Sequence, residues 1–217
     1  MFKPLLVLAV ALLSAHAATA SEPLETPVRR WSPGGPGGVP SFTKHVVPLF
    51  AKVGCSARAC HGSFQGQNGF RLSLFGYDPG LDHAELTADE GQGPRVNLQS
   101  VDQSLALKKP LGKIDHEGGE LLEEHGWPHR ILREWIAGGA TYDSKNDAKL
   151  LRMRVAPAAV PSLRKGDAAQ LQVLAEFTDG AVEDVTALTN FSSNDDSVAK
   201  VDEHGLVTAT GSGDTAI

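Results

Sequence analysis

Cysteine is scarce in this 217-residue chain, which contains two, and aromatic residues make up only 6% of it. A scaffold held together by several disulfides is therefore excluded. Lysine and arginine form no basic stripe and the formal net charge is −6, so nucleic acid is not an expected partner. Beyond the first twenty residues, no stretch is long and apolar enough to cross a bilayer stably. The chain also lacks the residue spacings of a hydrolase triad, a phosphate loop and a zinc site.

The N-terminus has the three parts of a secretory signal peptide. Lys3 supplies a short positive region, Leu5–Leu13 form an apolar run, and Ala18-Thr19-Ala20 is a small-residue cleavage site. We therefore expect residues 1–20 to direct export, which places the protein in the periplasm or at the cell surface.

Both cysteines lie in the stretch Gly54–Gly62, and Cys60 is followed at once by His61. Two cysteines with an adjoining histidine are the residues that attach a c-type haem, with the imidazole as proximal iron ligand. The usual spacing leaves two residues between the cysteines, whereas here four intervene, so the turn has to bulge or unwind. Two other interpretations stay open at this point: a Cys55–Cys60 disulfide, which export also permits, and two free thiols.

A helical domain is predicted for residues 41–142, after a Pro- and Gly-rich linker at residues 21–40. The alternative for residues 21–40 is an extended arm docked by Trp31. Ser41 is the expected N-cap of an amphipathic helix, which Pro48 should kink or divide and which runs directly into the cysteine stretch. A last amphipathic helix should begin near Pro128. The two helices have apolar residues at helical spacing: Phe42, Val46, Leu49, Phe50, Val53, Ile131, Leu132, Trp135 and Ile136.

The middle of this domain is rich in glycine and poor in large apolar side chains. Short helices are expected at residues 81–88 and through Leu105, with a short strand or extended segment at residues 70–75. A haem would supply the apolar surface that this middle region lacks, so we expect folding to depend on it. Elsewhere we expect three histidines at the surface and two aromatic residues in the core: His45, His83, His204, Tyr77 and Trp135.

From Leu151 onward the pattern changes to short stretches of alternating apolar and polar residues, separated by turns. Asp179-Gly180 is one such turn and a hairpin signal. Several short strands with regular turns predict an all-β sandwich over residues 151–217. Because Ile217 lies within what reads as another strand, we expect this domain to be incomplete. The predicted fold class is thus multi-domain, all-α followed by all-β.

A series of motifs runs in order through residues 41–142: Val47-Pro48-Leu49-Phe50, Gly54-Cys55 to Cys60-His61-Gly62, Gly69 to Pro79, Ser104-Leu105, Lys109-Pro110, His116-Glu117-Gly118-Gly119, Trp135-Ile136 and Gly139-Ala140. On these motifs, this part resembles the planctomycete-type cytochrome c domain. The resemblance implies an all-α cytochrome c-like fold with one covalent haem c on Cys55 and Cys60 and with His61 as proximal iron ligand. One branch of the family combines the widened cysteine spacing with a His-Gly-Gly stretch, which Glu117 interrupts here.

A second series of motifs lies in the C-terminal part: Phe177-Thr178-Asp179-Gly180, Asp184-Val185-Thr186, Phe191-Ser192-Ser193-Asn194, Val198 to Asp202 and Gly205 to Ala209. On these motifs, the part resembles the group 2 bacterial immunoglobulin-like domain. The resemblance implies a spacer that carries no activity of its own.

His116 is the expected sixth iron ligand, since it sits on a loop at the position where related domains present methionine. Met153, the one internal methionine, lies in the first strand of the next domain. The alternatives left open are a loop histidine in water and other ligands nearby: Lys108, Lys109, Lys113, His125 and His129.

The predicted function is an exported c-type cytochrome domain that transfers electrons with an unidentified redox partner protein and is joined to an immunoglobulin-like spacer. An enzymatic activity is not expected, although a haem peroxidase with an open iron position is a weaker alternative. The main alternative is a surface adhesion or structural protein with a Cys55–Cys60 disulfide and no haem.

Overall fold

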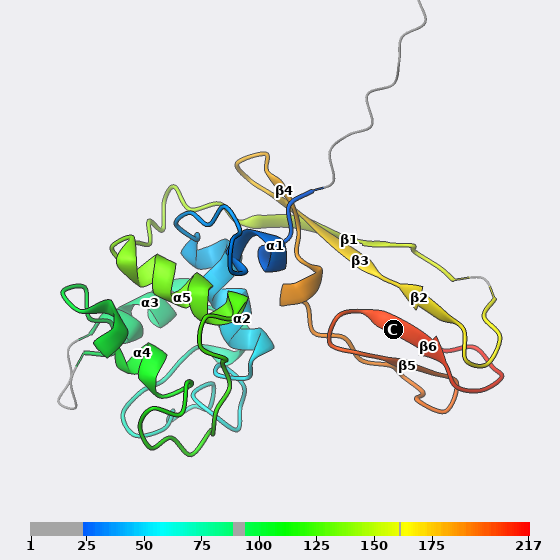
Figure 1. Cartoon of the computed structure of the whole chain (residues 1–217), viewed down its shortest axis with the longest axis horizontal. Helices are drawn as coiled ribbons and strands as arrows, with labels where there is room; N and C mark the ends of the chain where they lie inside the picture. Colours follow the sequence, from blue (N-terminus) through cyan, green and yellow to red (C-terminus); the bar gives the residue numbers. More distant parts are fainter. Residues whose placement is uncertain (1–23, 89–93, 161) are drawn as a thin grey trace, which may run out of the picture.

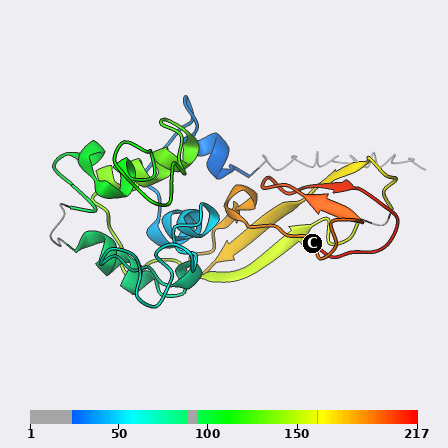
Figure 2. The same cartoon turned by 90° about the horizontal axis from the view of Figure 1, so that it is seen from below.

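The computed structural model describes residues 24–88, 94–160 and 162–217. A helical part (residues 24–149) and a strand part (residues 150–217) lie side by side in both views of the chain (Figures 1 and 2). The expected signal peptide at residues 1–20 lies outside the described residues. Within the described ranges, no helix is long and apolar enough to cross a membrane.

The helix that leads to the cysteine stretch changes type along its length. A π-helical turn, η1 (Phe42–Val46), continues into the α-helix α2 (Val47–Lys52). The Ser41 side chain accepts a hydrogen bond from the backbone N–H of Lys44, so Ser41 is the predicted N-cap. Pro48 lies in the first turn of α2, a position at which proline is tolerated. This division of the helix at Pro48 is one of the two outcomes expected there.

The core of the helical part forms where η1 crosses the last helix, α5 (Trp127–Ala137). The rings of Phe42 and Trp135 stack with their centroids 5.1 Å apart. Ile131, Leu132 and Trp135 are 0% exposed and Ile136 is 1% exposed, so the predicted apolar face of α5 is the buried face. The packing of this apolar face of α5 against η1, a helix far away in sequence, therefore forms the core of the helical part.

The segment expected to be a linker contains helix α1 (Pro27–Trp31), which packs against α5. Trp31 is 1% exposed, and its indole N–H donates to the carbonyl of Gly38 at 3.1 Å. Its ring also meets the ring of His45 edge to face at 4.7 Å. The structure therefore differs from the expected loose linker, because one large aromatic side chain docks the segment. It also corrects the expected surface position of His45, which is only 4% exposed.

Three short helical elements and one longer helix complete the helical part: η2 (Leu74–Gly76), α3 (Pro79–Thr87), η3 (Val101–Gln103) and α4 (Leu105–Lys108). In the segment expected at residues 70–75, residues 71–73 form no regular strand, and residues 74–75 belong to η2. One isolated bridge joins Gln67 to Phe70. Tyr77, expected in the core, is 92% exposed. It follows a sharp turn at Phe75 and Gly76, whose φ angles are 53° and 77°.

The strand part consists of two antiparallel three-stranded sheets. The first has the order β1-β3-β4, from β1 (Leu150–Ala156), β3 (Gln172–Phe177) and β4 (Val182–Asp184). The second has the order β2-β6-β5, from β2 (Ala168–Gln170), β6 (Leu206–Ala209) and β5 (Ala199–Val201). Asp179-Gly180 connects β3 to β4, as the hairpin signal predicted, and Gly180 has a φ of 82°. A sandwich-like all-β architecture is thus confirmed.

The two parts share one cluster of buried apolar side chains, which extends from Trp31 and Phe42 to Phe177 and Leu188. The η1–α2 helix also makes polar contacts with the strand part. Lys44 Nζ lies 2.6 Å from the Asp179 carboxylate. His45 Nε2 lies 2.8 Å from the Glu183 carboxylate, while its Nδ1 accepts the backbone N–H of Ser41. Lys52 Nζ donates to the carbonyls of Thr189 and Glu203, both at 2.7 Å. This junction is therefore both apolar and hydrogen-bonded.

Glu183 should make the junction sensitive to acid. Burial raises the pKa of this carboxyl, but the hydrogen bonds and charges of His45 and Lys44 outweigh burial and hold the pKa below its usual range. The stabilisation is present above the ordinary Glu pKa of about 4.3 and is lost as pH falls through the lowered value. We expect Glu183→Gln to lower the free energy of unfolding at pH 7 by about 1–2 kcal/mol.

Urea unfolding at a series of pH values measures this effect. The difference between the parent and Glu183→Gln should shrink below about pH 4, where the parent carboxyl also becomes neutral. Glu120→Gln, at an exposed position, serves as the control and should change little. A difference that stays constant from pH 7 to pH 3 would contradict the role given to the Glu183 charge.

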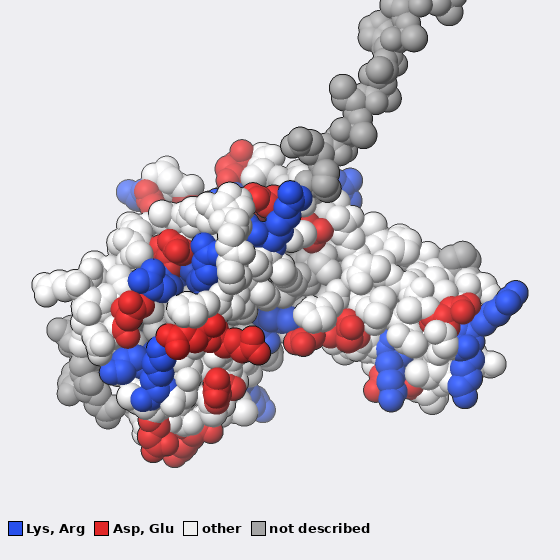
Figure 3. Space-filling model, in the orientation of Figure 1, with Lys and Arg blue, Asp and Glu red and all other residues white. Residues whose placement is uncertain are grey.

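On the face drawn in Figure 3, lysine and arginine side chains are interspersed with aspartate and glutamate over both parts. Two ion pairs on the helical part join Arg133 to Asp102, at 2.8 Å, and Lys113 to Glu124. Charge on this face is therefore mixed in sign, in keeping with a formal net charge of only −6.

Candidate functional site

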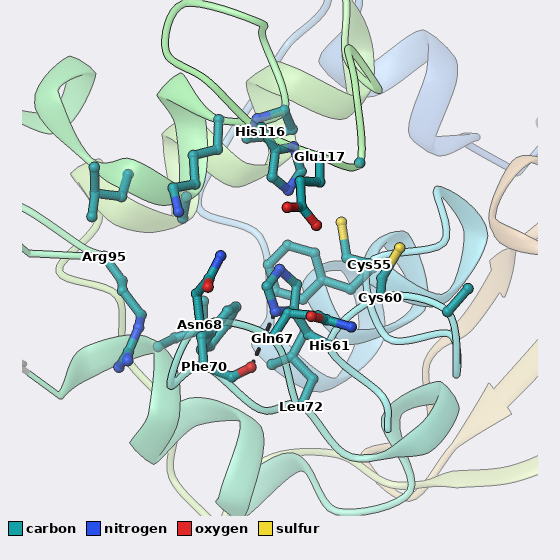
Figure 4. Close-up of a pocket in the computed structure, with 18 of the residues that line it drawn as sticks. Cys55, Cys60, His61, Gln67, Asn68, Phe70, Leu72, Arg95, His116 and Glu117 are labelled. Atoms are coloured by element: carbon teal, nitrogen blue, oxygen red, sulfur yellow. Dashed lines mark hydrogen bonds between the residues drawn. The ribbon is translucent and has the colours of Figure 1, made fainter. Parts of the chain in front are cut away.

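A cavity of about 520 Å³ lies in the helical part, between the loop that follows α2 and the loop that follows α4 (Figure 4). This volume falls within the range of about 300–1,000 Å³ that is typical of ligand sites. All four residues that the sequence predicted for the site line it: Cys55, Cys60, His61 and His116. Apolar side chains form much of the remaining wall: Phe50, Phe70, Leu72, Leu86 and Leu105. The cavity thus combines apolar walls with thiol and imidazole groups.

The widened cysteine spacing is accommodated by successive turns instead of a helix. The N–H of His61 donates to the carbonyl of Cys55 at 3.0 Å, and the N–H groups of Cys60 and Gly62 both donate to Ala57, each at 3.0 Å. Gly62 has to be glycine, because a Cβ there would lie 2.0 Å from the carbonyl oxygen of Ser56. These turns absorb the extra residues, as expected, and leave both thiols at the cavity wall.

The two cysteines are free thiols in this structure. Burial raises the pKa of the Cys55 thiol to about 12, with a further contribution from neighbouring Cys60. At neutral pH this thiol stays protonated in the folded chain.

His61 is held in one orientation by a backbone group. Its Nδ1 lies 3.1 Å from the carbonyl oxygen of Phe70, and because a carbonyl only accepts, Nδ1 carries the proton. This assignment leaves Nε2 free to act as a ligand. Burial lowers the pKa of His61, and the positive groups around it add to this effect against the opposing Phe70 hydrogen bond. The ring is thus neutral at neutral pH, as a metal ligand has to be.

His116 is held in the same way by its own loop. Its Nδ1 lies 3.2 Å from the carbonyl oxygen of Gly119, which again leaves Nε2 unengaged. A Cβ on Gly118 would lie 2.8 Å from the His116 ring, so the glycine at this position makes room for the imidazole. Glu117 interrupts the His-Gly-Gly pattern and is itself part of the cavity wall.

The His61 and His116 rings have a mutual geometry that suits one iron atom between them. Figure 4 draws the two rings on opposite sides of the cavity. Their centroids are 6.3 Å apart and their planes differ by 7°. Two metal–imidazole bonds of about 2 Å, plus the distance from each nitrogen to its ring centre, give a separation of about 6 Å. The residues present therefore fit a haem held by thioether bonds to Cys55 and Cys60, with His61 and His116 as axial ligands.

Within residues 24–88, 94–160 and 162–217, no group of three or more His, Cys, Asp or Glu side chains is arranged to hold a bare metal ion. Haem iron requires only one or two protein ligands, because the porphyrin supplies the other four nitrogens.

The other residues considered for the sixth position lie elsewhere, except for one lysine. Lys109 lines the cavity, whereas Lys113 pairs with Glu124. His125 and His129 lie at the start of α5, with ring centroids 6.1 Å apart, and are not among the described cavity-lining residues. Met153 lies in β1 and is 52% exposed. His116 is thus the histidine that the structure brings opposite His61.

Sequence reasoning missed the backbone groups around the site. The carbonyl of Phe70 orients His61, yet no side chain signals this role. One signal was available: Asn68-Gly69 is the residue pair preferred in a two-residue hairpin, which would have placed Phe70 beside Gln67.

Residues 152–217 match the family of bacterial Ig-like domains (group 2), and the match covers β1 to β6 of the strand part. The immunoglobulin-like domain predicted from the sequence is thereby confirmed. No curated protein matches this chain. Group 2 domains typically occur in extracellular or surface proteins. The family match covers the C-terminal part of the chain, and the cytochrome c resemblance of residues 41–142 stays a prediction.

Proposed function

We propose that this chain is an exported c-type cytochrome module in which residues 41–142 bind one covalent haem c and transfer electrons. The Ig-like domain (residues 152–217) acts as its spacer in the periplasm or at the cell surface. One observation carries the proposal: two near-parallel imidazoles 6.3 Å apart share a cavity with two free thiols. Thiols and imidazoles are the groups that hold a c-type haem.

Each group of the site has a role in this proposal. Cys55 and Cys60 would form the two thioether bonds, and His61 and His116 would bind the iron. When bound, the haem supplies a one-electron couple. The hydrogen bond from His61 to the Phe70 carbonyl fixes the tautomer and raises the basicity of the imidazole. Two imidazole ligands favour a lower reduction potential than a histidine–methionine pair gives.

The walls of the cavity support electron transfer rather than substrate chemistry. Phe50, Phe70, Leu72 and Leu86 present apolar surface to the cavity, against which the apolar part of a haem would pack. If His61 and His116 both bind the iron, no iron position would be left open to a substrate, unlike in a peroxidase. The partner in this proposal is another redox protein.

A surface structural protein without haem is the second candidate, and the match of residues 152–217 to group 2 Ig-like domains favours it. In that function, Cys55 and Cys60 would be oxidised to a disulfide in an exported chain.

The deciding experiment is expression of the full chain with export to a periplasm that contains the c-type haem maturation machinery. We expect the denatured protein to retain haem on a gel, to gain the mass of one haem, and to give a pyridine haemochrome typical of two thioethers. The same chain made in the cytoplasm is the matched control and should carry no covalent haem. An exported chain that lacks haem and has lost two hydrogens to a disulfide would support the structural protein instead.

A further inference from the structure

An arginine outside the predicted ligand set braces the turn that orients His61. We propose that Arg95 is a positioning residue, which holds the Asn68-Gly69 turn so that the Phe70 carbonyl stays on His61 Nδ1. This inference rests on the proposed function, in which His61 is the proximal ligand. It assigns control of the orientation and basicity of that ligand to Arg95.

The turn itself is tight and well defined. Asn68 and Gly69 have φ angles of 51° and 72°, the left-handed conformations of a type I′ hairpin turn. The flanking residues exchange backbone hydrogen bonds, from Gln67 to Phe70 at 2.9 Å and from Phe70 to Gln67 at 3.0 Å. The Phe70 carbonyl therefore accepts two hydrogen bonds, one from Gln67 N–H and one from His61 Nδ1–H. Any displacement of the turn moves the acceptor of the His61 proton.

The turn has little support of its own, because a two-stranded hairpin is at best marginally stable in water. Arg95 supplies support from outside. Its Nη2 donates to the carbonyl of Gly69 at 3.0 Å, and its Nη1 donates to the carbonyl of Glu85 in α3 at 2.7 Å. Its guanidinium also lies 4.8 Å from the centroid of the Phe70 ring. The Arg95 side chain thus connects the Asn68-Gly69 turn to α3 and lies against the ring of Phe70.

The backbone of Arg95 is itself anchored. Its carbonyl accepts the N–H of Ala106 in α4 at 3.0 Å. The brace therefore connects three elements, namely the turn, α3 and α4, and both the turn and α4 contribute to the cavity wall. A flexible lysine cannot donate to two carbonyls in the fork geometry of a guanidinium while it stacks on a ring. Charge alone would therefore not replace Arg95.

The test uses the holoprotein with Arg95→Lys, which keeps the positive charge. In the reduced, diamagnetic state, NMR measures the hydrogen exchange rate of the His61 Nδ1 proton. We expect this exchange to be about tenfold faster or more in Arg95→Lys, since an outer-shell partner of a ligand has effects of this size. We also expect the reduction potential to rise, because a less basic imidazole stabilises the oxidised iron less well.

Arg71→Lys is the matched control, because Arg71 lies next to Phe70 in sequence but reaches only the carbonyl of Phe64, at 3.5 Å. It should leave both readouts unchanged. Gly69→Ala is a second route to the same effect. A Cβ there meets no atom within 4 Å, yet alanine is strained at a φ of 72°, so the variant loosens the turn without touching Arg95.

The outcomes separate the two proposals. Holoprotein with parental exchange and potential in Arg95→Lys would overturn the positioning role of Arg95. If Arg95→Lys yields no folded holoprotein, Gly69→Ala decides: faster exchange and a raised potential support the brace, and parental values overturn it. A parent chain that carries no covalent haem would overturn the proposed function, and the inference with it.

Discussion

Replacing His116 by alanine should convert a closed, low-spin iron site into one that binds carbon monoxide in the reduced state and cyanide in the oxidised state. The parent should bind neither to a measurable extent, because His61 and His116 would both bind the iron in the proposed site. The structural reason is that His116 is the histidine opposite His61, with ring centroids 6.3 Å apart. Absorption spectra of the purified holoprotein, recorded with and without each ligand, measure the change.

His125→Ala is the matched control, since His125 is an exposed histidine nine residues further along the chain and is not among the described cavity-lining residues. Its spectrum should remain that of the parent. Lys109 lines the cavity and is able to take the emptied position, so His116→Ala/Lys109→Ala should bind carbon monoxide at least as readily as the single variant. An unchanged low-spin spectrum in the double variant would end the assignment of His116.

The second large effect concerns the chain without haem. In Cys55→Ser/Cys60→Ser, backbone hydrogen exchange in residues 53–73 and 104–122 should become about a hundredfold faster or more than in the holoprotein. These segments surround the cavity of about 520 Å³ and contain mostly turns, so the cofactor supplies much of their apolar contact. A group that binds only the folded state stabilises the segments that contact it.

The helices η1 and α5 should keep most of their protection in the same variant. Their contact rests on Phe42, Ile131 and Trp135, which are at most 1% exposed and are not among the cavity-lining residues. Backbone hydrogen exchange followed by mass spectrometry of peptides distinguishes the cavity segments from the helices η1 and α5. Equal protection of residues 53–73 with and without haem would contradict the dependence on the cofactor, and loss of protection throughout would show that the helical core also depends on it.

Much of the helical part could be predicted, because its signals are local. The spacing of Ile131, Leu132 and Trp135 identifies the buried face of α5, and Ser41 identifies the start of the helix that leads to Cys55. The docking of Trp31 was an alternative in the sequence, but the composition around it favoured a linker. Contacts made after folding, among them those of Trp31 with Gly38 and His45, order the segment. His45 is buried for the same tertiary reason.

The residues of the candidate site also differ in whether a local sequence signal identified them. Cys55, Cys60 and His61 are adjacent in sequence, so their spacing alone identified them as a group. His116 came from the resemblance to a known domain, and the structure brings it opposite His61. The role of the Phe70 carbonyl and the brace from Arg95 depend on backbone atoms of a turn, which carry no residue-specific signal.

The junction between the two parts has a mechanical consequence. Lys52, the last residue of α2, donates to two carbonyls of the Ig-like domain, and the chain then enters the turn that carries Cys55. A pulling force on the Ig-like domain is therefore transmitted through Lys52 to the loop of the candidate site, as well as along the covalent chain from α5. The candidate site therefore lies next to a residue that carries force between the two parts of the chain.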